Sequence, residues 1–350
     1  MVKPKYFPKQ SVSRLADKRA SVLILALWSL LFLTALAVIV NSVVRQKLEM
    51  VGRLDNRSKL NLIAEAGINK AILQLAKEDF TGFTAFRNLC LDTPAASKDI
   101  PIGDGKVDIC YPVTDPLGRE VLRYGVVDEA RKININKANM ATLKRLFVAA
   151  TGCDIMQAQE LAACVIDWRD KDSFYSLPSG SAENPEYLGL ARPYRAKDNA
   201  FEVLDELLLV QGITPDVFAK LKDYVTIYGD SDMNLVNINT APKPVLLSLG
   251  LSEELVEKIL AFRNGPDGLE GTVDDNIFID LEEMTNTLMR YTPLTKGEII
   301  ELRNAQGLYF TLTSGYFMVR AEARLPTSKE KSETVAIINS GGEILYWQES

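Results

Sequence analysis

Residues 21–44, SVLILALWSLLFLTALAVIVNSVV, form an unbroken apolar run near the start of the chain. The run has no charged residue, no proline and no glycine, so nothing in it interrupts a helix. A helix needs about 20 mainly apolar residues to cross a bilayer, and this run is long enough. Apolar residues continue at helical spacing as far as Leu75, which predicts one helix of about 55 residues that starts in a membrane and continues out of it.

A basic leader precedes this run, with six basic residues and one acidic residue in positions 1–20. Positive flanks stay in the cytoplasm, so we expect a single-pass protein with a cytoplasmic N-terminus. A secretory signal peptide would have a shorter apolar region with a small-residue cleavage site behind it, and a plain signal anchor would remain uncut. Here Lys18-Arg19-Ala20-Ser21 places a basic pair and a small residue in front of the run instead.

This site is similar to the prepilin peptidase site of type IV pilins and of the pseudopilins of type II secretion. The resemblance implies a cut between Ala20 and Ser21, with the apolar helix retained and its new terminus methylated. Ala20 stands where glycine is usual before the cut, and Leu25 stands where most pilins carry a glutamate. Among pseudopilins, the K subunit is the one that typically lacks this glutamate.

Composition limits the chemistry that the chain can perform. The 350 residues leave room for two or three domains, and the net charge of −6 becomes −11 once the leader is removed. An acidic surface repels phosphate backbones, so we expect no nucleic-acid partner. The chain has no histidine, the commonest general base and neutral metal ligand, and we expect no enzymatic activity.

Four cysteines, Cys90, Cys110, Cys153 and Cys164, all follow the apolar run. An even number in an exported region favours disulfides, and pairing of sequence neighbours would give Cys90–Cys110 and Cys153–Cys164. Two other connectivities are possible, and buried free thiols are the alternative to any disulfide.

An internal repeat covers the middle of the chain. Residues 132–138, KININKA, are echoed by residues 235–241, LVNINTA, and each echo precedes two short helices. Residues 204–229 show the same helix–glycine–helix layout. We expect Asn136 and Asn239 to cap the helices that follow them. Glycines in left-handed turns are expected between the helices of each pair, at Gly152, Gly212 and Gly250.

This layout is the helix-hairpin-helix pattern, whose turns often bind the DNA backbone. The NINTA motif at residues 237–241 resembles that of competence DNA receptors, so a membrane-anchored DNA receptor is the alternative function. DNA binding would need basic residues around the hairpin turns. The turns at residues 151–154, 211–214 and 249–254 are neutral to acidic, which favours a structural or protein-contact role.

A closer resemblance covers nearly the whole chain. Short motifs stand here in the order typical of K-type minor pseudopilins of type II secretion: Asp167-Trp168-Arg169-Asp170-Lys171-Asp172, then Ser181-Ala182-Glu183 near Tyr187, Pro193-Tyr194-Arg195, Leu204-Asp205-Glu206-Leu207, Val210-Gln211-Gly212-Ile213-Thr214 and Val236-Asn237-Ile238-Asn239-Thr240-Ala241. Ser181 departs from the glycine expected in that loop. The resemblance implies a structural protein at the tip of the secretion pseudopilus, which supports export of folded proteins across the outer membrane.

The same resemblance implies the location and partners. The protein would lie in the bacterial inner membrane with its C-terminal domain in the periplasm, and would join the pseudopilus tip after assembly. Its partners would be the I-type and J-type minor pseudopilins, the major pseudopilin and the prepilin peptidase.

Two acidic segments are candidate calcium sites, because K-type pseudopilins bind calcium in their helical insertion. Calcium takes about six to eight oxygen ligands, which a flexible acidic loop can supply. The candidate ligands are Asp167, Asp170, Asp172 and Glu183 in the earlier segment, and Asp267, Glu270, Asp274 and Asp275 in the later one. The later segment lacks the residue order of an EF-hand, and a solvated turn is the alternative for that loop.

The remaining segments alternate polar and apolar residues and predict strands. We therefore expect an α+β fold, a pilin-like long N-terminal helix packed on an antiparallel sheet and interrupted by a large all-α insertion of helix-hairpin-helix or SAM-like subdomains. The expected boundaries are 1–20 for the cleaved leader, 21–79 for the transmembrane and extended helix, 80–130 for the first part of the β core, 131–311 for the helical insertion and 312–350 for the final strands.

Overall fold

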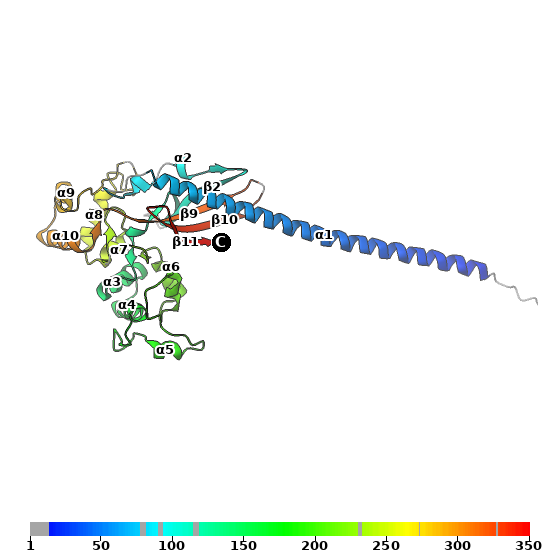
Figure 1. The fold of residues 1–350 in the computed structure, drawn as a ribbon, viewed down its shortest axis with the longest axis horizontal. Coiled ribbons are helices and arrows are strands. Elements are labelled where there is room, and N and C mark those ends of the chain that lie inside the picture. The colour runs from blue at the N-terminus through cyan, green and yellow to red at the C-terminus, as the bar shows by residue number, and fades with distance from the viewer. Residues whose placement is uncertain are drawn as a thin grey trace, which may run out of the picture. The chain divides into compact units, whose positions relative to one another are not determined.

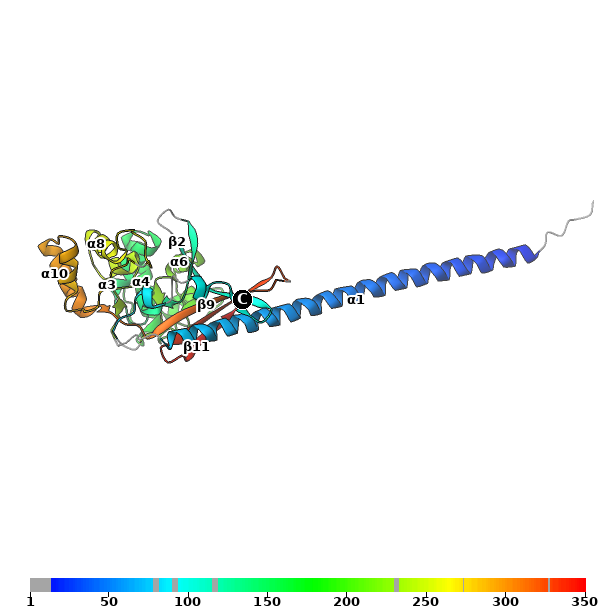
Figure 2. The ribbon, with the colours of Figure 1, turned by 90° about the horizontal axis from the view of Figure 1, so that it is seen from above.

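The computed structural model describes residues 14–77, 82–89, 94–114, 119–229, 233–272, 274–326 and 328–350. The chain divides after Lys59 into two compact units. One helix, α1 (Arg14–Leu75), begins in the first unit and ends in the second (Figures 1 and 2). At 62 residues it is slightly longer than the predicted helix, and it includes the predicted membrane span.

In the first unit, α1 exposes its apolar side chains and is long and apolar enough to cross a membrane, with a window of mean hydropathy 2.8. Three of its polar side chains bond back to the helix itself. The hydroxyls of Ser29, Thr34 and Ser42 donate to carbonyl oxygens three residues earlier, at 2.8 to 2.9 Å. These three groups therefore need no other partner in lipid.

The second unit contains an antiparallel sheet with seven strands among the described residues. Its main path runs β1-β2-β9-β10-β11, while β3 pairs with β2 and β4 pairs with β9. The strands are β1 (Ile100–Ile102), β2 (Gly105–Thr114), β3 (Glu120–Tyr124), β4 (Val127–Asp128), β9 (Tyr316–Arg324), β10 (Lys331–Asn339) and β11 (Ile344–Glu349). The pairing of β2 with β3 confirms the predicted hairpin, whose turn at 116–118 lies outside the described residues.

The last turns of α1 pack on this sheet. Leu60, Ala64 and Ile68 recur at helical spacing and are buried in one core with Val107 of β2. Gly67 allows the close approach, because a β-carbon there would lie 2.7 Å from a methyl of Val107. A long helix on an antiparallel sheet confirms the predicted α+β class.

Between α1 and the sheet, and between β4 and β5, the chain forms short helical segments: η1 (Phe86–Leu89), α2 (Pro94–Ser97) and η2 (Glu129–Arg131). A helical insertion then separates β4 from β9 (Figure 1). Its elements are β5 (Ile133–Asn134), α3 (Met140–Thr151), α4 (Ile155–Arg169), α5 (Asn184–Leu188), η3 (Leu204–Leu209), α6 (Pro215–Leu221), β6 (Val225–Thr226), β7 (Val236–Asn237), α7 (Lys243–Ser248), α8 (Glu253–Arg263), α9 (Met284–Tyr291), α10 (Lys296–Leu308) and β8 (Phe310–Thr311).

The insertion consists of two units with the same plan. In each, a short strand leads into two helices and an irregular loop, and a final strand returns to pair in parallel with the first: β5 with β6, and β7 with β8. We call residues 133–229 the first repeat unit and residues 233–311 the second. Both share one apolar core, which is separate from the core of the sheet.

The hairpin glycines behave as predicted, but the helix caps do not. Gly152, Gly212 and Gly250 have positive φ values of 73°, 84° and 93°. The cap of α3 is Asn139, whose side chain accepts a hydrogen bond from the backbone N–H of Thr142, and the cap of α7 is Pro242. The prediction that Asn136 and Asn239 are N-caps is therefore wrong.

Candidate functional site

The asparagines of the two NIN motifs organise the repeat units from within. Asn136 exchanges two hydrogen bonds with the backbone of Phe201, at 2.7 and 3.0 Å. Asn239 exchanges the equivalent pair with the backbone of Phe278, at 2.8 and 2.9 Å. Each amide therefore pins the segment that follows the irregular loop, which is why its side chain is not available as a helix cap.

An arginine ends the second helix of each unit in an equivalent position. Arg169 donates to the carbonyl oxygens of Ile135 and Ala138. Arg263 donates to those of Ile238 and Ala241, at 3.2 and 2.5 Å. Burial lowers the pKa of both guanidinium groups to about 10. Each arginine fixes its NIN turn, and the acidic loop of the unit begins directly after it.

In the first repeat unit, four carboxylates share a largely buried space that we call the first acidic cluster: Asp167, Asp170, Glu183 and Asp198. Asp167 and Glu183 are 0% and 1% exposed. Asp167 Oδ2, Asp170 Oδ1, Asp198 Oδ1 and both carboxylate oxygens of Glu183 are buried without a hydrogen-bond partner among the described residues. Buried carboxylate oxygens are costly unless something neutralises them.

The electrostatics of this cluster reflect the lack of partners. Burial, reinforced by neighbouring acids that include Asp167, raises the pKa of Asp170 to about 6. Burial and the charges of Asp167 and Asp170 raise the pKa of Glu183 to about 7. A divalent cation would relieve both effects, and carboxylate oxygens are the ligands that calcium prefers. The chemistry of these oxygens therefore suits calcium.

The cluster is not a finished coordination shell as it stands. Across the described residues, no three acidic or cysteine side chains converge closely enough to hold a metal ion directly. Asp172, a predicted ligand, is exposed and accepts a hydrogen bond from the backbone N–H of Phe174. Asp198, which the sequence analysis missed, takes a place in the cluster with a positive φ of 50°.

The second acidic loop, residues 264–277, satisfies its own carboxylates. Asp267 accepts from the backbone N–H of Leu269, and Asp275 accepts from that of Gly271 at 2.7 Å. Asp274 accepts from the hydroxyl of Thr272 at 2.6 Å, which lowers its pKa. Glu270 is paired with arginines. The four predicted ligands of this loop are brought together by hydrogen bonds, and none of them is left without a partner.

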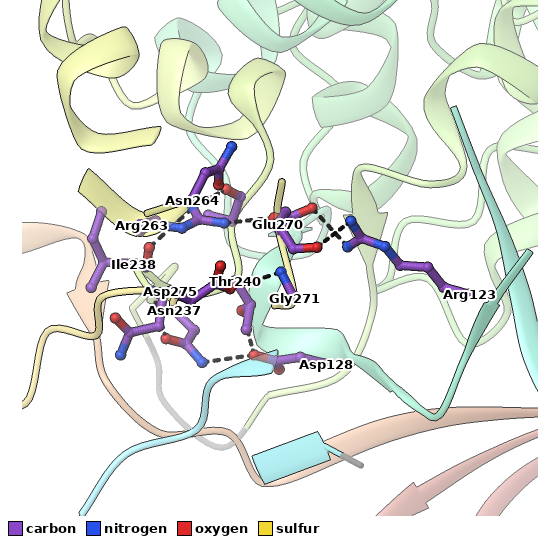
Figure 3. Close-up of polar contacts among 12 residues, drawn as sticks. Arg123, Asp128, Asn237, Ile238, Thr240, Arg263, Asn264, Glu270, Gly271 and Asp275 are labelled. Atoms are coloured by element: carbon purple, nitrogen blue, oxygen red, sulfur yellow. Dashed lines mark hydrogen bonds and ion pairs between the residues drawn. The ribbon is translucent and has the colours of Figure 1, made fainter. Parts of the chain in front are cut away.

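A buried polar joint connects the second repeat unit to the sheet (Figure 3). Asp128, at the end of β4, accepts from Asn237 Nδ2 at 2.7 Å and from the hydroxyl of Thr240 at 2.6 Å. Burial raises the pKa of Asp128, and these donors oppose the rise. The NINTA motif therefore serves as a docking element for the sheet, a role that its sequence did not predict.

Comparisons with known proteins show which proteins this chain resembles. A family model described as type II secretion system (T2SS), protein K, matches residues 124–230. The chain is 29% identical over 191 residues to type II secretion system protein K of Aeromonas hydrophila, covering 51% of this chain and 52% of that protein. It is 32% identical over 116 residues to the protein of that name from Pectobacterium carotovorum subsp. carotovorum, covering 32% and 34%. The alignments thus span about half and about a third of these curated relatives.

In sequence, part of the chain is similar to the type II secretion system protein K family. A solved structure has the same fold: a chain of the GspK-GspI-GspJ complex from enterotoxigenic Escherichia coli matches with a TM-score of 0.59. The match covers 87% of this chain and 98% of that one at 16% identity. The family matched is the one that the motif order had indicated.

The predicted processing site lies within the described helix. The backbone of Ala20 and Ser21 is helical and continuous with the rest of α1. Cleavage between them stays a prediction.

Of the two predicted disulfides, Cys153–Cys164 is wrong, and Cys90–Cys110 includes a residue outside the described part of the chain. Cys110, Cys153 and Cys164 all carry free thiols, and Cys90 lies outside the described residues. Cys153 directly precedes the N-cap of α4 and Cys164 lies in that helix, so about 15 Å of helix separates them, whereas a disulfide needs α-carbons within about 7 Å. The buried Cys164 thiol donates to the carbonyl of Gly180, and burial raises its pKa to about 12.

The hairpin turns of the helical insertion offer little to a phosphate backbone. Ile155 and Met156 are 67% and 74% exposed in the first turn of α4. The first turn of α8 carries Glu253 and Glu254. Apolar and acidic groups in these positions do not attract DNA.

Proposed function

We propose that the protein is a minor pseudopilin at the tip of a type II secretion pseudopilus. One observation carries the proposal: a helix able to span a membrane leads into a pilin-like sheet that is interrupted by the duplicated helical insertion. The role is structural and supports the export of folded proteins across the outer membrane. The N-terminus would face the cytoplasm, and the sheet and insertion would lie in the periplasm.

The size of the insertion and Leu25 support a place at the tip. Residues 133–311 add a second core to the pilin-like head, which leaves little room for another subunit above it. In pilin assembly, the glutamate that Leu25 replaces is thought to pair with the terminal amine of a neighbouring subunit. A first subunit with no neighbour above it can lack this glutamate.

The partners would be I-type and J-type minor pseudopilins, the major pseudopilin and the prepilin peptidase. Co-expression of the full-length chain with the I-type and J-type subunits of the same organism tests this proposal. We expect a complex that survives purification in detergent and size-exclusion chromatography. Elution of the chain alone, with all subunits folded and present, would contradict it.

We further propose that calcium binds the first acidic cluster. The support is the set of buried carboxylate oxygens on Asp167, Asp170, Glu183 and Asp198 that have no hydrogen-bond partner among the described residues. The ion would neutralise these groups and order the loop between Arg169 and Phe201. The second acidic loop would take no ion, because hydrogen bonds and arginines already hold its carboxylates.

Isothermal titration of the detergent-solubilised protein with calcium tests this assignment. We expect saturable binding that is lost in the double variant Asp170→Asn, Glu183→Gln. The matched control, Asp274→Asn with Asp275→Asn, removes the same number of charges from the second loop and should bind calcium as the unmodified chain does. Loss of binding in the control alone would move the site to the second loop.

A further inference from the structure

Three arginines from different parts of the compact unit that follows Lys59 converge on one aromatic ring. Arg123 comes from β3, Arg131 ends η2 and Arg263 ends α8. Their guanidinium carbons lie 5.7, 5.3 and 5.9 Å from the centre of the Phe86 ring. The ring attracts each cation, but three like charges in one place repel each other unless an anion lies among them.

Glu270 is that anion. Its Oε1 lies 2.7 Å from Arg263 Nη2, and its Oε2 lies 3.1 Å from Arg123 Nη1. Arg123 also donates to the backbone carbonyl of Glu270. Figure 3 shows Glu270 between the two guanidinium groups, with Arg123 reaching it from the sheet and Arg263 from the insertion.

Asp275 holds the backbone next to Glu270 in place through hydrogen bonds within the loop. Asp275 Oδ2 accepts from the backbone N–H of Gly271 at 2.7 Å, and its Oδ1 lies 3.3 Å from the hydroxyl of Thr272. The loop therefore presents the Glu270 side chain in a fixed position. Arg263 is 3% exposed, and Glu270 is the carboxylate that forms an ion pair with it.

We propose that Glu270 is the shared counter-ion of an arginine latch, made by Arg123, Arg131 and Arg263, that fixes the second repeat unit to the sheet. The latch joins residues that are 147 positions apart in the chain. It lies beside the Asp128 joint and needs no metal ion. The inference is independent of the proposed secretion role and of calcium binding.

The charge arrangement gives the latch a signature that a simple packing contact would lack. Glu270→Gln leaves Arg123 and Arg263, which are largely shielded from water, without their anion beside the third cation Arg131, so it should be more harmful than Arg123→Gln. In the double variant, one of the repelling cations is also gone. Arg123→Gln should therefore partly rescue Glu270→Gln, which independent sites would not do.

Hydrogen exchange followed by mass spectrometry on the full-length protein in detergent tests the latch. We expect Glu270→Gln to speed exchange by about tenfold or more in segments 119–124, 236–241 and 264–272. Arg123→Gln should speed it less, and the double variant should lie between the two. Arg320→Gln is the matched control, because its bidentate pair with Glu333 lies inside the sheet, and its arginine has the same 21% side-chain exposure as Arg123.

The control should change exchange in β9 and β10 only. Unchanged exchange in segment 264–272 of Glu270→Gln, or additive effects in the double variant, would overturn the proposal. If Glu270→Gln does not fold, Arg123→Gln decides the matter alone: faster exchange in segment 264–272 supports the latch, and exchange equal to that of the control contradicts it.

Discussion

Arg169 and Arg263 make the same two hydrogen bonds in the two repeat units, but the carboxylates that follow them have different partners. After Arg263, Glu270 meets two arginines, and the neighbouring aspartates accept from backbone N–H groups and a hydroxyl. After Arg169, five carboxylate oxygens of the first acidic cluster are buried without a hydrogen-bond partner in the described chain.

The comparison shows two ways to neutralise an acidic loop on one scaffold. In the second loop, the guanidinium of Arg123 from the sheet neutralises Glu270 and also attaches the loop to the sheet. Among the described residues, no guanidinium from the sheet pairs with the first acidic cluster, so its carboxylates would depend on a cation from solution. Calcium should therefore stabilise the first repeat unit, and the stability of the second repeat unit should not depend on calcium.

The largest effect should come from the two equivalent arginines. Arg263→Met leaves two buried carbonyls and one arm of Glu270 unpaired, so it should lower the free energy of unfolding by about 3–5 kcal/mol. Arg169→Met loses the carbonyl bonds alone and should cost about 1–3 kcal/mol. Urea unfolding of the solubilised protein measures both free energies, and equal losses in the two variants would contradict the proposed difference between the repeat units.

Calcium should act on one loop only. At a concentration about 100 times the dissociation constant, it should raise the thermal midpoint of the chelated protein by about 5 °C. Asp170→Asn with Glu183→Gln should abolish this shift, and Asp274→Asn with Asp275→Asn should leave it. A thermal scan with calcium, magnesium and chelator tests the assignment, and a shift that survives the first pair of substitutions contradicts it.

The two asparagine pins should differ with their burial. Asn239 is 4% exposed, whereas Asn136 is only partly buried, although both make the same pair of backbone hydrogen bonds. Asn239→Ala should cost about 2–3 kcal/mol and Asn136→Ala about 1 kcal/mol, because an orphaned backbone group is worse when water cannot reach it. Chemical denaturation of the two single variants measures the difference, and a reversed order would be contrary to this reasoning.

The smallest effect is a pH dependence of the first acidic cluster without calcium. The folded pKa values of about 6 for Asp170 and about 7 for Glu183 lie above the ordinary values of 3.8 and 4.5. The folded state therefore binds extra protons, and this stabilisation is complete below the ordinary values and lost as the pH rises through 6 and 7.

In chelator, the thermal midpoint of the unmodified protein should fall relative to that of Asp170→Asn, Glu183→Gln between about pH 5 and pH 7.5. The single variant Asp274→Asn should not change this profile, because the pKa of Asp274 is lowered and its contribution is lost only on acidification. If the thermal midpoints of the unmodified protein and of the variant Asp170→Asn, Glu183→Gln change with pH in parallel, the cluster is not under electrostatic strain.

The sequence predicted the features that depend on local periodicity. The helical spacing of apolar residues as far as Leu75 predicted the part of α1 that packs on the sheet, and the alternation of polar and apolar residues predicted the final strands. The repeat was visible because residues 132–138 and 235–241 are nearly the same. Aligning the two units further would also have matched Arg169 with Arg263, which each follow an aromatic residue.

The remaining features depend on contacts between distant residues, for which one sequence has no signal. Arg123 meets Glu270 across 147 positions, and Asp128 meets Asn237 across 109. Asn136 and Asn239 bond to backbone that lies 65 and 39 residues ahead, so reading them as local caps failed. Cys153 and Cys164 are close in sequence but are held apart by the helix between them.

Mass spectrometry of the mature N-terminus tests the central claim most directly, because pilins and pseudopilins are cut in front of the membrane helix and keep that helix, whereas signal peptides and plain signal anchors are not processed in this way. The protein purified from the membrane of a host with an active prepilin peptidase should begin at Ser21, carry an N-terminal methyl group and retain residues 21–44. A chain that still begins at Met1 in that host, or one that begins after Val44, would contradict the account.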